Sequence, residues 1–223
     1  VDGILYPQEF EERMEELAGG DEDRMVGISD YAAGKDFHSG SRKVALVNCL
    51  GSIHTGKTEG NPFGGSPTIG SKTFVDILED IIEDDDVEAV VMRVNSPGGS
   101  ALASDIIWES VRRLAEKKPV VVSMGAVAAS GGYYISMAAD SVFCDPTSIT
   151  GSIGVIMLKP HAGELLDKIG VSVDSINRGP LSDEFTIYKP FNTEGREAFA
   201  RSANRIYDIF TAKLMVHGVD VWL

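Results

Sequence analysis

The sequence predicts an α/β fold in which a mostly parallel sheet is flanked by helices. Short runs of β-branched and other apolar residues alternate along the chain with segments whose apolar residues recur at helical spacing. Strands separated by helices pair in parallel, because each helix carries the chain back across the sheet before the next strand begins. The 24 glycines are consistent with the tight turns that such crossovers need.

The 223 residues are enough to bury the core of one domain. We expect this domain to be preceded by an acidic connector. We assign the connector to residues 1–38, where the stretch PQEFEERMEEL carries apolar residues at positions i, i+4 and i+7 of a short amphipathic helix. The domain itself is assigned to residues 39–218. Residues 219–223 are interpreted as a truncated end.

Within the domain, strands and helices are expected to alternate. Runs rich in β-branched residues predict strands at residues 43–53, 87–96 and 119–125, with shorter strand-like pieces at 141–146 and 151–156. Apolar residues at helical spacing predict helices at residues 72–86, 103–118, 162–171 and 194–215. A stretch rich in glycine and proline predicts a surface loop at residues 58–71.

Composition argues against several classes of function. The net charge is −14, which disfavours both nucleic acid and anionic lipid headgroups as partners. The four histidines show no metal-ligand spacing, so neither a metal site nor a cofactor is predicted. Cys49 and Cys144 are interpreted as free thiols, with a disulfide between them as the alternative. No run approaches the roughly 18 apolar residues of a membrane span, so we expect this fragment to be soluble.

Two loops that leave successive predicted strands are the candidate site. VNSPGGS follows one strand, and its glycines allow bare backbone N–H groups to face a ligand. SMGAVAASGGYY leaves the next strand and places Ser130 at the start of a helix, where the helix dipole stabilises a developing anion. The amides of Gly99 and Gly131 are then able to point at one spot and form an oxyanion hole. The alternative is that Ser130 simply caps the helix.

Three motifs together resemble a known family. VMRVNSPGGSALASD, KPVVVSMGAVAASGGYYISMAAD and TSITGSIGVI, in this order and spacing, are similar to signal peptide peptidase A (protease IV), a family of serine peptidases. The resemblance extends from about Arg42 to Met215. It implies a Clp protease/crotonase-like fold, a mostly parallel sheet with repeated ββα units flanked by helices. The residues before Arg42 are also similar to the connector between the two halves of the long, duplicated form, so we interpret the chain as its C-terminal half.

The resemblance also implies a role for each candidate residue. Ser130 is the expected nucleophile, and the backbone amides of Gly99 and Gly131 are the expected oxyanion hole. The family uses a lysine as general base, in a Ser/Lys dyad, and Ser152 occupies the position of a hydroxyl that orients this lysine. A lysine acts as a base only when burial lowers its pKa toward neutrality.

The lysine itself is missing from its expected place. The matching region is NRGPLSDEFTIYKPFN, where alignment from either end gives Ser182 or a position near Phe185, neither of which is basic. Four other residues are weaker candidates for the base: Lys159, His161, Lys168 and Lys189. We therefore predict that the chain carries the nucleophile and the oxyanion hole, and that the absent N-terminal half or another subunit supplies the lysine.

The expected function is a serine endopeptidase that degrades signal peptides and other apolar peptides. The resemblance implies a homo-oligomer associated with the outer face of the cytoplasmic membrane. One alternative is a catalytically silent half that serves as a scaffold or binds peptides, because the lysine is missing. Another is a crotonase-like acyl-CoA enzyme, which the absence of Glu or Asp from AVAASGGYY disfavours.

Overall fold

The computed structural model describes residues 43–58, 66–216 and 221–222. The chain divides into two compact units, Val1–Arg42 and Lys43–Leu223. The first unit lies outside the described residues, and so does the connector predicted at residues 1–38. Of the end predicted at residues 219–223, only the backbone of residues 221–222 is described.

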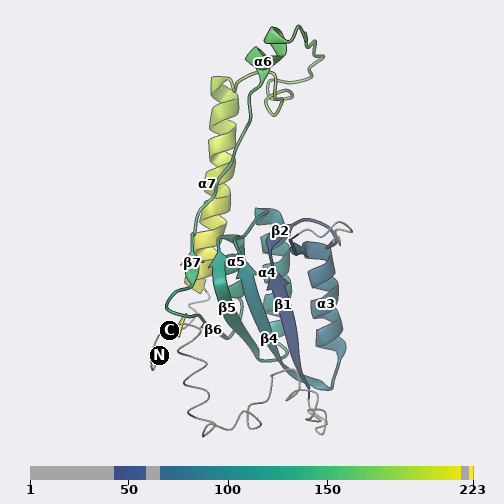
Figure 1. Ribbon diagram of the computed structural model, residues 1–223, viewed down its shortest axis with the longest axis vertical. Coiled ribbons are helices and arrows are strands. Elements are labelled where there is room, and N and C mark those ends of the chain that lie inside the picture. The colour runs from purple at the N-terminus through teal and green to yellow at the C-terminus, as the bar shows by residue number, and fades with distance from the viewer. Residues whose placement is uncertain (1–42, 59–65, 217–220, 223) are drawn as a thin grey trace, which may run out of the picture. The chain divides into compact units, whose positions relative to one another are not determined.

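A parallel sheet forms the centre of the second unit (Figure 1). Its path runs through β1 (Lys43–Leu50), β4 (Val87–Ser96), β5 (Val120–Ala129), β6 (Ser141–Phe143) and β8 (Val221–Trp222). A further strand, β7 (Ile149–Gly151), pairs with the end of β5, and β2 (Ser52–His54) pairs with β3 (Thr68–Gly70) in a separate small sheet. All these pairings are parallel, as predicted from the alternation of strands and helices.

Helices pack on one face of this sheet and bury it. The helices between the first strands are α3 (Ser71–Glu83) and α4 (Ala101–Ala115), and α5 (Gly131–Ser136) follows β5 directly. Leu78 of α3 and Ile107 and Leu114 of α4 are fully buried, as are the side chains of β4 that face them: Val90, Met92 and Val94. The opposite face is open along β1, where Val44 is 65% and Leu46 is 64% exposed.

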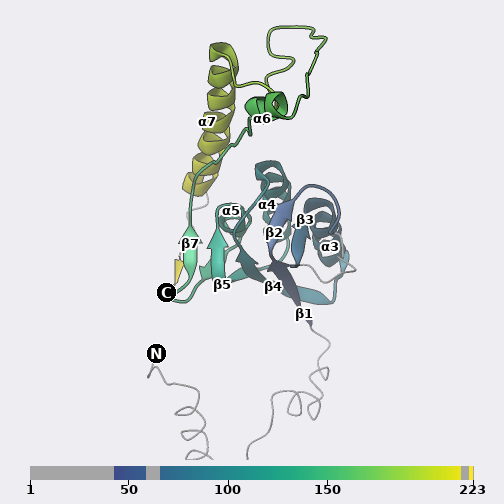
Figure 2. The same ribbon diagram turned by 45° about the horizontal axis from the view of Figure 1, so that its top comes forward.

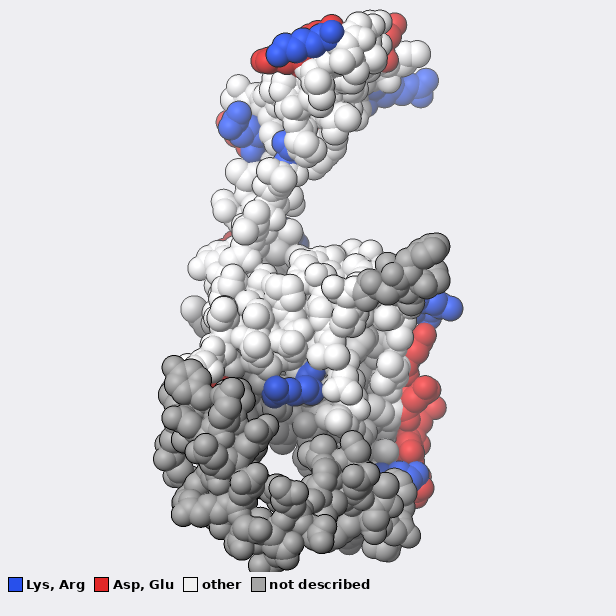
Figure 3. Space-filling view, in the orientation of Figure 1, with Lys and Arg blue, Asp and Glu red and all other residues white. Residues whose placement is uncertain are grey.

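Charged side chains avoid much of the open face. Figure 3 shows this side of the molecule as largely uncharged, with acidic side chains gathered along the edge formed by α3. The exposed acidic residues of that helix are Asp76, Glu79, Asp80 and Glu83. These side chains lie on the solvent side of an amphipathic helix, where their charges stay hydrated.

The last part of the unit consists of a long helix and a separate tip. Helix α7 (Thr193–Val216) has 24 residues, and α6 (Gly163–Lys168) lies beside its N-terminal end in both views (Figures 1 and 2). We define the tip as residues 159–199. Its own small core contains the rings of Phe185, Phe191 and Phe199, whose centroids lie 4.8–6.3 Å apart.

The strand predicted at residues 151–156 forms only in part. Pairing with β5 stops at Gly151, opposite Ala129. Beyond Ala129 the chain of the neighbouring strand β5 turns into α5. The residues that follow Gly151 therefore have no strand beside them. Residues 152–161 consequently have no regular secondary structure.

Three further observations on the described residues concern the cysteines, possible metal ligands and the apolar character of the helices. Cys49 and Cys144 are free thiols, and burial raises the pKa of Cys49 to about 12. Within the described ranges, no group of three or more His, Cys, Asp or Glu side chains has the arrangement of a metal site. Among the same residues, none of the helices has the length and apolar character needed to cross a membrane.

Candidate active site

The two predicted site loops meet at one edge of the sheet. β4 ends at Ser96 and β5 ends at Ala129, and the register places Ser96 beside Ala128. Because the strands are parallel and adjacent, the loops that follow them leave the sheet side by side. The structure thus brings together the segment Pro97–Ser100 and the segment that begins at Ser130, as the sequence predicted.

Ser130 has a strained backbone at the turn from β5 into α5. Its φ is 51° and its ψ is −116°, a conformation that non-glycine residues rarely adopt. Two hydrogen bonds hold it there, because its N–H donates to Gly151 O at 2.8 Å and its carbonyl accepts from Tyr134 N at 2.8 Å. Ser130 occupies the N-cap position of α5, but its side chain makes no capping hydrogen bond. The interpretation of the hydroxyl as a simple helix cap is therefore wrong.

The backbone amides of Gly99 and Gly131 lie next to each other beside Ser130. A Cβ added to Gly131 would lie 3.2 Å from the backbone N of Gly99, and one added to Gly98 would lie 2.5 Å from the backbone N of Gly131. Gly98 has a φ of 97°, which glycine adopts without strain. Within the described part of the chain, neither of the two N–H groups donates a hydrogen bond. Two adjacent, unused donors are the arrangement that an oxyanion hole requires.

Strand β2 holds the glycine segment in place. The N–H of Ile53 donates to Gly98 O at 2.9 Å, and Ile53 O accepts from Ser100 N at 2.8 Å. These bonds form an isolated parallel bridge between Ile53 and Gly99. The amide of Gly99 is left out of this bridge, so its direction is fixed while its hydrogen remains available.

A pocket of about 580 Å³ opens beside Ser130. Its lining comes from the two glycine loops, from the start of α4 and α5, from the segment after β7 and from α7. The apolar part of the lining includes Val155, Ile156, Met157, Ile206 and Phe210. Ser152 also lines the pocket, with a φ of 49°. Ser130, Gly99, Gly131 and Ser152 are thus all brought to one cavity.

The pocket contains no evident base. Among the described residues that line it, none is a lysine, a histidine, an aspartate or a glutamate. A serine hydroxyl in an apolar pocket is a weak nucleophile until a neighbouring group accepts its proton. The arrangement therefore supplies anion stabilisation around Ser130 and requires a proton acceptor from elsewhere.

Lys189, one of the candidate bases, is held as a cation. Its Nζ lies 2.5 Å from a carboxylate oxygen of Asp183 and 3.6 Å from one of Glu184. The hydrogen bond to Asp183 and the nearby negative charges raise the pKa of Lys189 above its usual value. A lysine whose pKa is raised stays protonated at neutral pH and does not accept a proton from serine.

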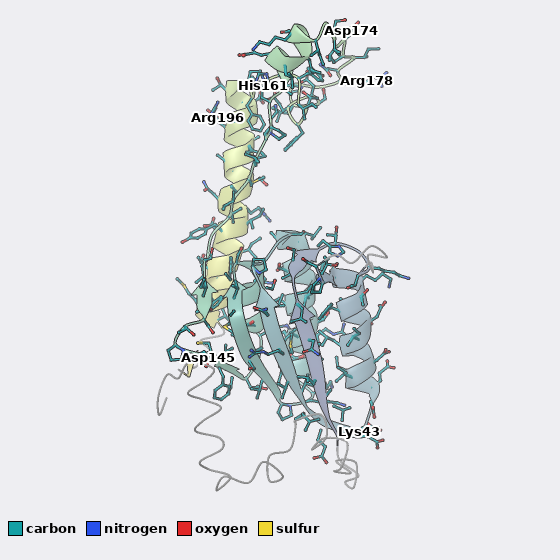
Figure 4. All side chains as sticks on the ribbon, in the orientation of Figure 1. Lys43, Asp145, His161, Asp174, Arg178 and Arg196 are labelled. Atoms are coloured by element: carbon teal, nitrogen blue, oxygen red, sulfur yellow. The ribbon has the colours of Figure 1, made fainter. Side chains whose placement is uncertain are left out.

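The other candidate bases also lie in the tip. Lys159 Nζ lies 4.2 Å from the centroid of the Phe191 ring, and Lys168 is exposed on α6. His161 lies near the N-terminal end of α7 (Figure 4). Ser182 and Phe185 belong to the same tip. At a rise of 1.5 Å per residue, α7 carries the chain roughly 25 Å from Phe210 in the pocket to Thr193 at the tip.

A polar cluster beside the pocket was not predicted from the sequence. We call it the α7 latch and define it as Asp105, Tyr134 and Lys213. Tyr134 donates from its hydroxyl to Asp105 Oδ1 at 2.6 Å, and Lys213 pairs with the same carboxylate. Burial alone would raise the pKa of Asp105, but the hydrogen bonds from Lys213 and Tyr134 outweigh burial and lower it. Burial and the bond to Asp105 raise the pKa of Tyr134, so its hydroxyl remains a donor.

Comparison with known proteins gives two family matches. The model of peptidase family S49 matches residues 112–216, and the model of Clp protease matches residues 71–150. The second match confirms the predicted Clp protease-like fold, since it covers α3 to β7. The first covers Ser130, Gly131 and Ser152.

Individual relatives agree with these matches. "Serine protease SPPA, chloroplastic" of Arabidopsis thaliana is 32% identical over 225 residues, which cover 96% of this chain and 32% of the relative. "Protease 4" of Haemophilus influenzae is 40% identical over 182 residues, which cover 81% of this chain and 26% of the relative. "Putative signal peptide peptidase SppA" of Enterococcus faecium is 36% identical over 143 residues, 62% of this chain and 41% of the relative.

The chain therefore spans about a third or less of the length of the first two of these relatives. The motifs around Ser130, the two family matches and the similarity to proteases of the SppA and protease 4 type all agree. The chain belongs to peptidase family S49.

Proposed function

We propose that the whole protein containing this chain is a serine endopeptidase with Ser130 as its nucleophile and a lysine as its general base. The observation that carries the proposal is the position of Ser130: a strained, uncapped serine next to two unused backbone N–H groups. Backbone strain of this kind is characteristic of functional positions, where the surrounding structure holds an unfavourable conformation. Membership of a peptidase family and similarity to relatives named as proteases support the same reaction.

The reaction begins with attack on a peptide carbonyl. Ser130 Oγ forms a bond to the carbonyl carbon while its proton passes to the neutral amine of the lysine. The carbonyl oxygen becomes an oxyanion and accepts hydrogen bonds from the N–H groups of Gly99 and Gly131. One such donor contributes roughly 3–4 kcal/mol to stabilisation of the transition state. The lysine then gives its proton to the leaving amine, and the C–N bond breaks to leave an acyl-enzyme.

Water completes the cycle. The neutral lysine takes a proton from water, whose oxygen attacks the ester carbon of the acyl-enzyme. A second oxyanion forms at the same two N–H groups and collapses to release the carboxylic acid, while the lysine returns its proton to Ser130 Oγ. We assign Ser152 to the orientation of the lysine, because its hydroxyl lines the same pocket.

The lysine is proposed to come from another part of the whole protein or from another subunit. Two observations support this source: no lysine lines the described pocket, and the candidate lysines of this chain lie in the tip. Relatives about three times longer than the chain have room for a further domain that could supply it. Insertion into the apolar pocket would remove water from the amine and lower its pKa, as a basic lysine requires.

The proposed substrates are extended, apolar peptides, including signal peptides. Val155, Ile156, Met157, Ile206 and Phe210 give the pocket an apolar wall suited to hydrophobic side chains. The Enterococcus relative is named as a putative signal peptide peptidase, which supports the same substrate class. We further propose a homo-oligomer that works at the outer face of the cytoplasmic membrane.

Two alternatives predict different behaviour. A catalytically silent half is favoured by the lack of a base in the described pocket, and it predicts that the whole protein does not hydrolyse peptides. A crotonase-like acyl-CoA enzyme generally uses acidic residues for proton transfer, and no carboxylate lines the described pocket. The peptidase is therefore the better supported function.

Hydrolysis of an apolar peptide tests the proposal. The whole protein is expected to cleave an internally quenched peptide with hydrophobic side chains, and Ser130→Ala should remove this activity. Ser172→Ala, at an exposed serine of the tip, is the matched control and should retain it. Equal rates for the Ser130→Ala variant and the unaltered protein would refute the proposed nucleophile.

A further inference from the structure

Few residues of helix α7 pack against the rest of the domain. Of its 24 residues only Gly195 and Phe210 are buried, and Gly195 belongs to the tip. Phe210 is 3% exposed and joins the main core, against which the partly buried Leu214 also packs. The position of this long helix against the domain thus depends on a short segment near its C-terminal end.

The α7 latch supplies the polar part of these contacts. The ammonium group of Lys213 pairs with Asp105 of α4 and lies 3.4 Å from the centroid of the Trp108 ring. The Lys213 side chain is 20% exposed and the Asp105 side chain 45%, so solvent reaches this pair mainly from the Asp105 side. A cation over an indole face adds a further attraction.

The same latch reaches α5, the helix that begins directly after Ser130. Asp105 Oδ1 accepts a hydrogen bond from Tyr134 of α5, and the Tyr134 ring lies 4.6 Å from the ring of Phe210. Tyr134 also donates its backbone N–H to the carbonyl of Ser130. One carboxylate therefore connects α4, α5 and α7 within one helical turn of the candidate nucleophile.

The latch residues also determine one wall of the pocket. Tyr134 and Phe210 both line the cavity beside Ser130, and Ile206 lies one helical turn before Phe210 on the same helix. If α7 shifts away from α5, both Ile206 and Phe210 leave this wall. The pocket would then lose apolar contact area on the side that α7 provides.

We propose that Asp105 and Lys213 are positioning residues that hold α7 against α5 and thereby form the apolar wall that selects large hydrophobic groups bound next to Ser130. This inference rests on the proposed function, because it assigns a specificity role at the same site. Neither residue touches the reacting atoms. Their effect passes through Tyr134 and Phe210.

Two covalent probes of different size test the proposal. The whole protein is treated with a fluorophosphonate that carries an ethyl group and with one that carries a phenylethyl group, and labelling rates at Ser130 are measured by mass spectrometry. For Lys213→Met and Asp105→Asn, the rate with the large probe is expected to fall about tenfold, while the rate with the small probe changes less than about twofold. Lys213→Arg keeps the charge and the stacking on Trp108, so it should restore selectivity for the large probe.

A matched control separates the latch from a general effect on α7. Arg201→Met removes an ion pair with Glu197 on the same helix, at a side chain that is 66% exposed, and should leave both rates unchanged. Equal loss with both probes in the latch variants, or the same loss of selectivity in Arg201→Met, overturns the inference. Unchanged selectivity in both latch variants also overturns it.

Failure of the proposed function gives a different result. If neither probe labels Ser130 in the unaltered protein, the proposed nucleophile is wrong, and hydrogen exchange then tests the latch alone. Faster exchange at residues 131–136 and 206–214 in Lys213→Met, but not in Arg201→Met, supports the positioning role. Equal exchange in the two variants and the unaltered protein refutes it.

Discussion

The backbone N–H of Ser130 donates a 2.8 Å hydrogen bond to the carbonyl oxygen of Gly151. This bond continues the pairing of β5 with β7 by one step beyond Ala129. It ties the candidate nucleophile to the residue that precedes Ser152, and both serines have a positive φ. The two strained serines are thus held at one cavity by the same short stretch of sheet.

The first prediction concerns Ser152. Ser152→Ala keeps the side chain short but removes the hydroxyl that we assign to orienting the lysine. We expect kcat for peptide hydrolysis by the whole protein to fall about 10- to 100-fold, with little change in KM, because an unoriented base transfers protons less efficiently. Steady-state kinetics check this split. A rise in KM at unchanged kcat would instead assign Ser152 to substrate binding.

The second prediction concerns the close approach of Gly98 to the oxyanion site. A Cβ at Gly98 would lie 2.5 Å from Gly131 N and 2.9 Å from Ser130 Cβ, at a φ of 97°. Gly98→Ala should therefore remove peptidase activity and lower the free energy of unfolding by roughly 1–3 kcal/mol. Activity assays and urea denaturation measure the two effects.

Gly170→Ala is the matched control for this prediction. Gly170 also has a positive φ, of 75°, but a Cβ there meets no heavy atom within 4 Å. The control should show a cost in stability without loss of activity. Loss of activity in both variants would mean that backbone strain in general, and not the crowded amide of Gly131, is responsible.

The third prediction is a pH dependence of stability from Asp105. The folded state lowers the pKa of this carboxyl, so its contribution is present above the unfolded pKa of roughly 3.9 and is lost as pH falls through the folded value. The unaltered protein should be more stable than Asp105→Asn between about pH 5 and 7, and the difference should vanish in more acidic solution. Urea denaturation at a series of pH values measures it. A difference that grows on acidification would contradict the assignment.

The fourth prediction concerns the two thiols. Burial raises the pKa of Cys49 to about 12, so its reactive thiolate is scarce at pH 8, and the side chain is fully buried. Cys144 is partly exposed. A thiol reagent at pH 8 should label Cys144 first in the native protein, and Cys49 only after unfolding. Equal labelling rates in the native state would contradict the burial of the Cys49 side chain.

The strands and the site loops could be predicted from the sequence because local patterns specify them. The apolar runs before Ser96 and Ala129 indicate adjacent strands, and the glycines after them indicate loops in which backbone amides are free. In parallel strands these loops share one edge, so the approach of Gly99 to Gly131 follows from topology. The strain at Ser130 and Ser152 depends on the pairing of β7 and has no local signal.

Contacts between distant segments could not be predicted in this way. Asp105 and Lys213 are 108 residues apart, and each is ordinary on the surface of an amphipathic helix. The ion pairs of Lys189 depend on how the tip folds around Glu184, which is only 1% exposed. The end of the strand at Gly151 depends on where its partner turns into α5. Each of these features results from tertiary packing, which the periodicity of apolar residues along the sequence does not encode.

The most direct test of the central claim is to identify the residue that a serine-directed probe modifies. The whole protein is treated with a small fluorophosphonate, digested and analysed by peptide mass mapping. We expect one phosphonylated residue, Ser130, and no adduct in Ser130→Ala. Labelling of residues 1–223 expressed alone should be much slower, because the described pocket holds no base. An adduct at a different serine, or labelling that persists in Ser130→Ala, would contradict it.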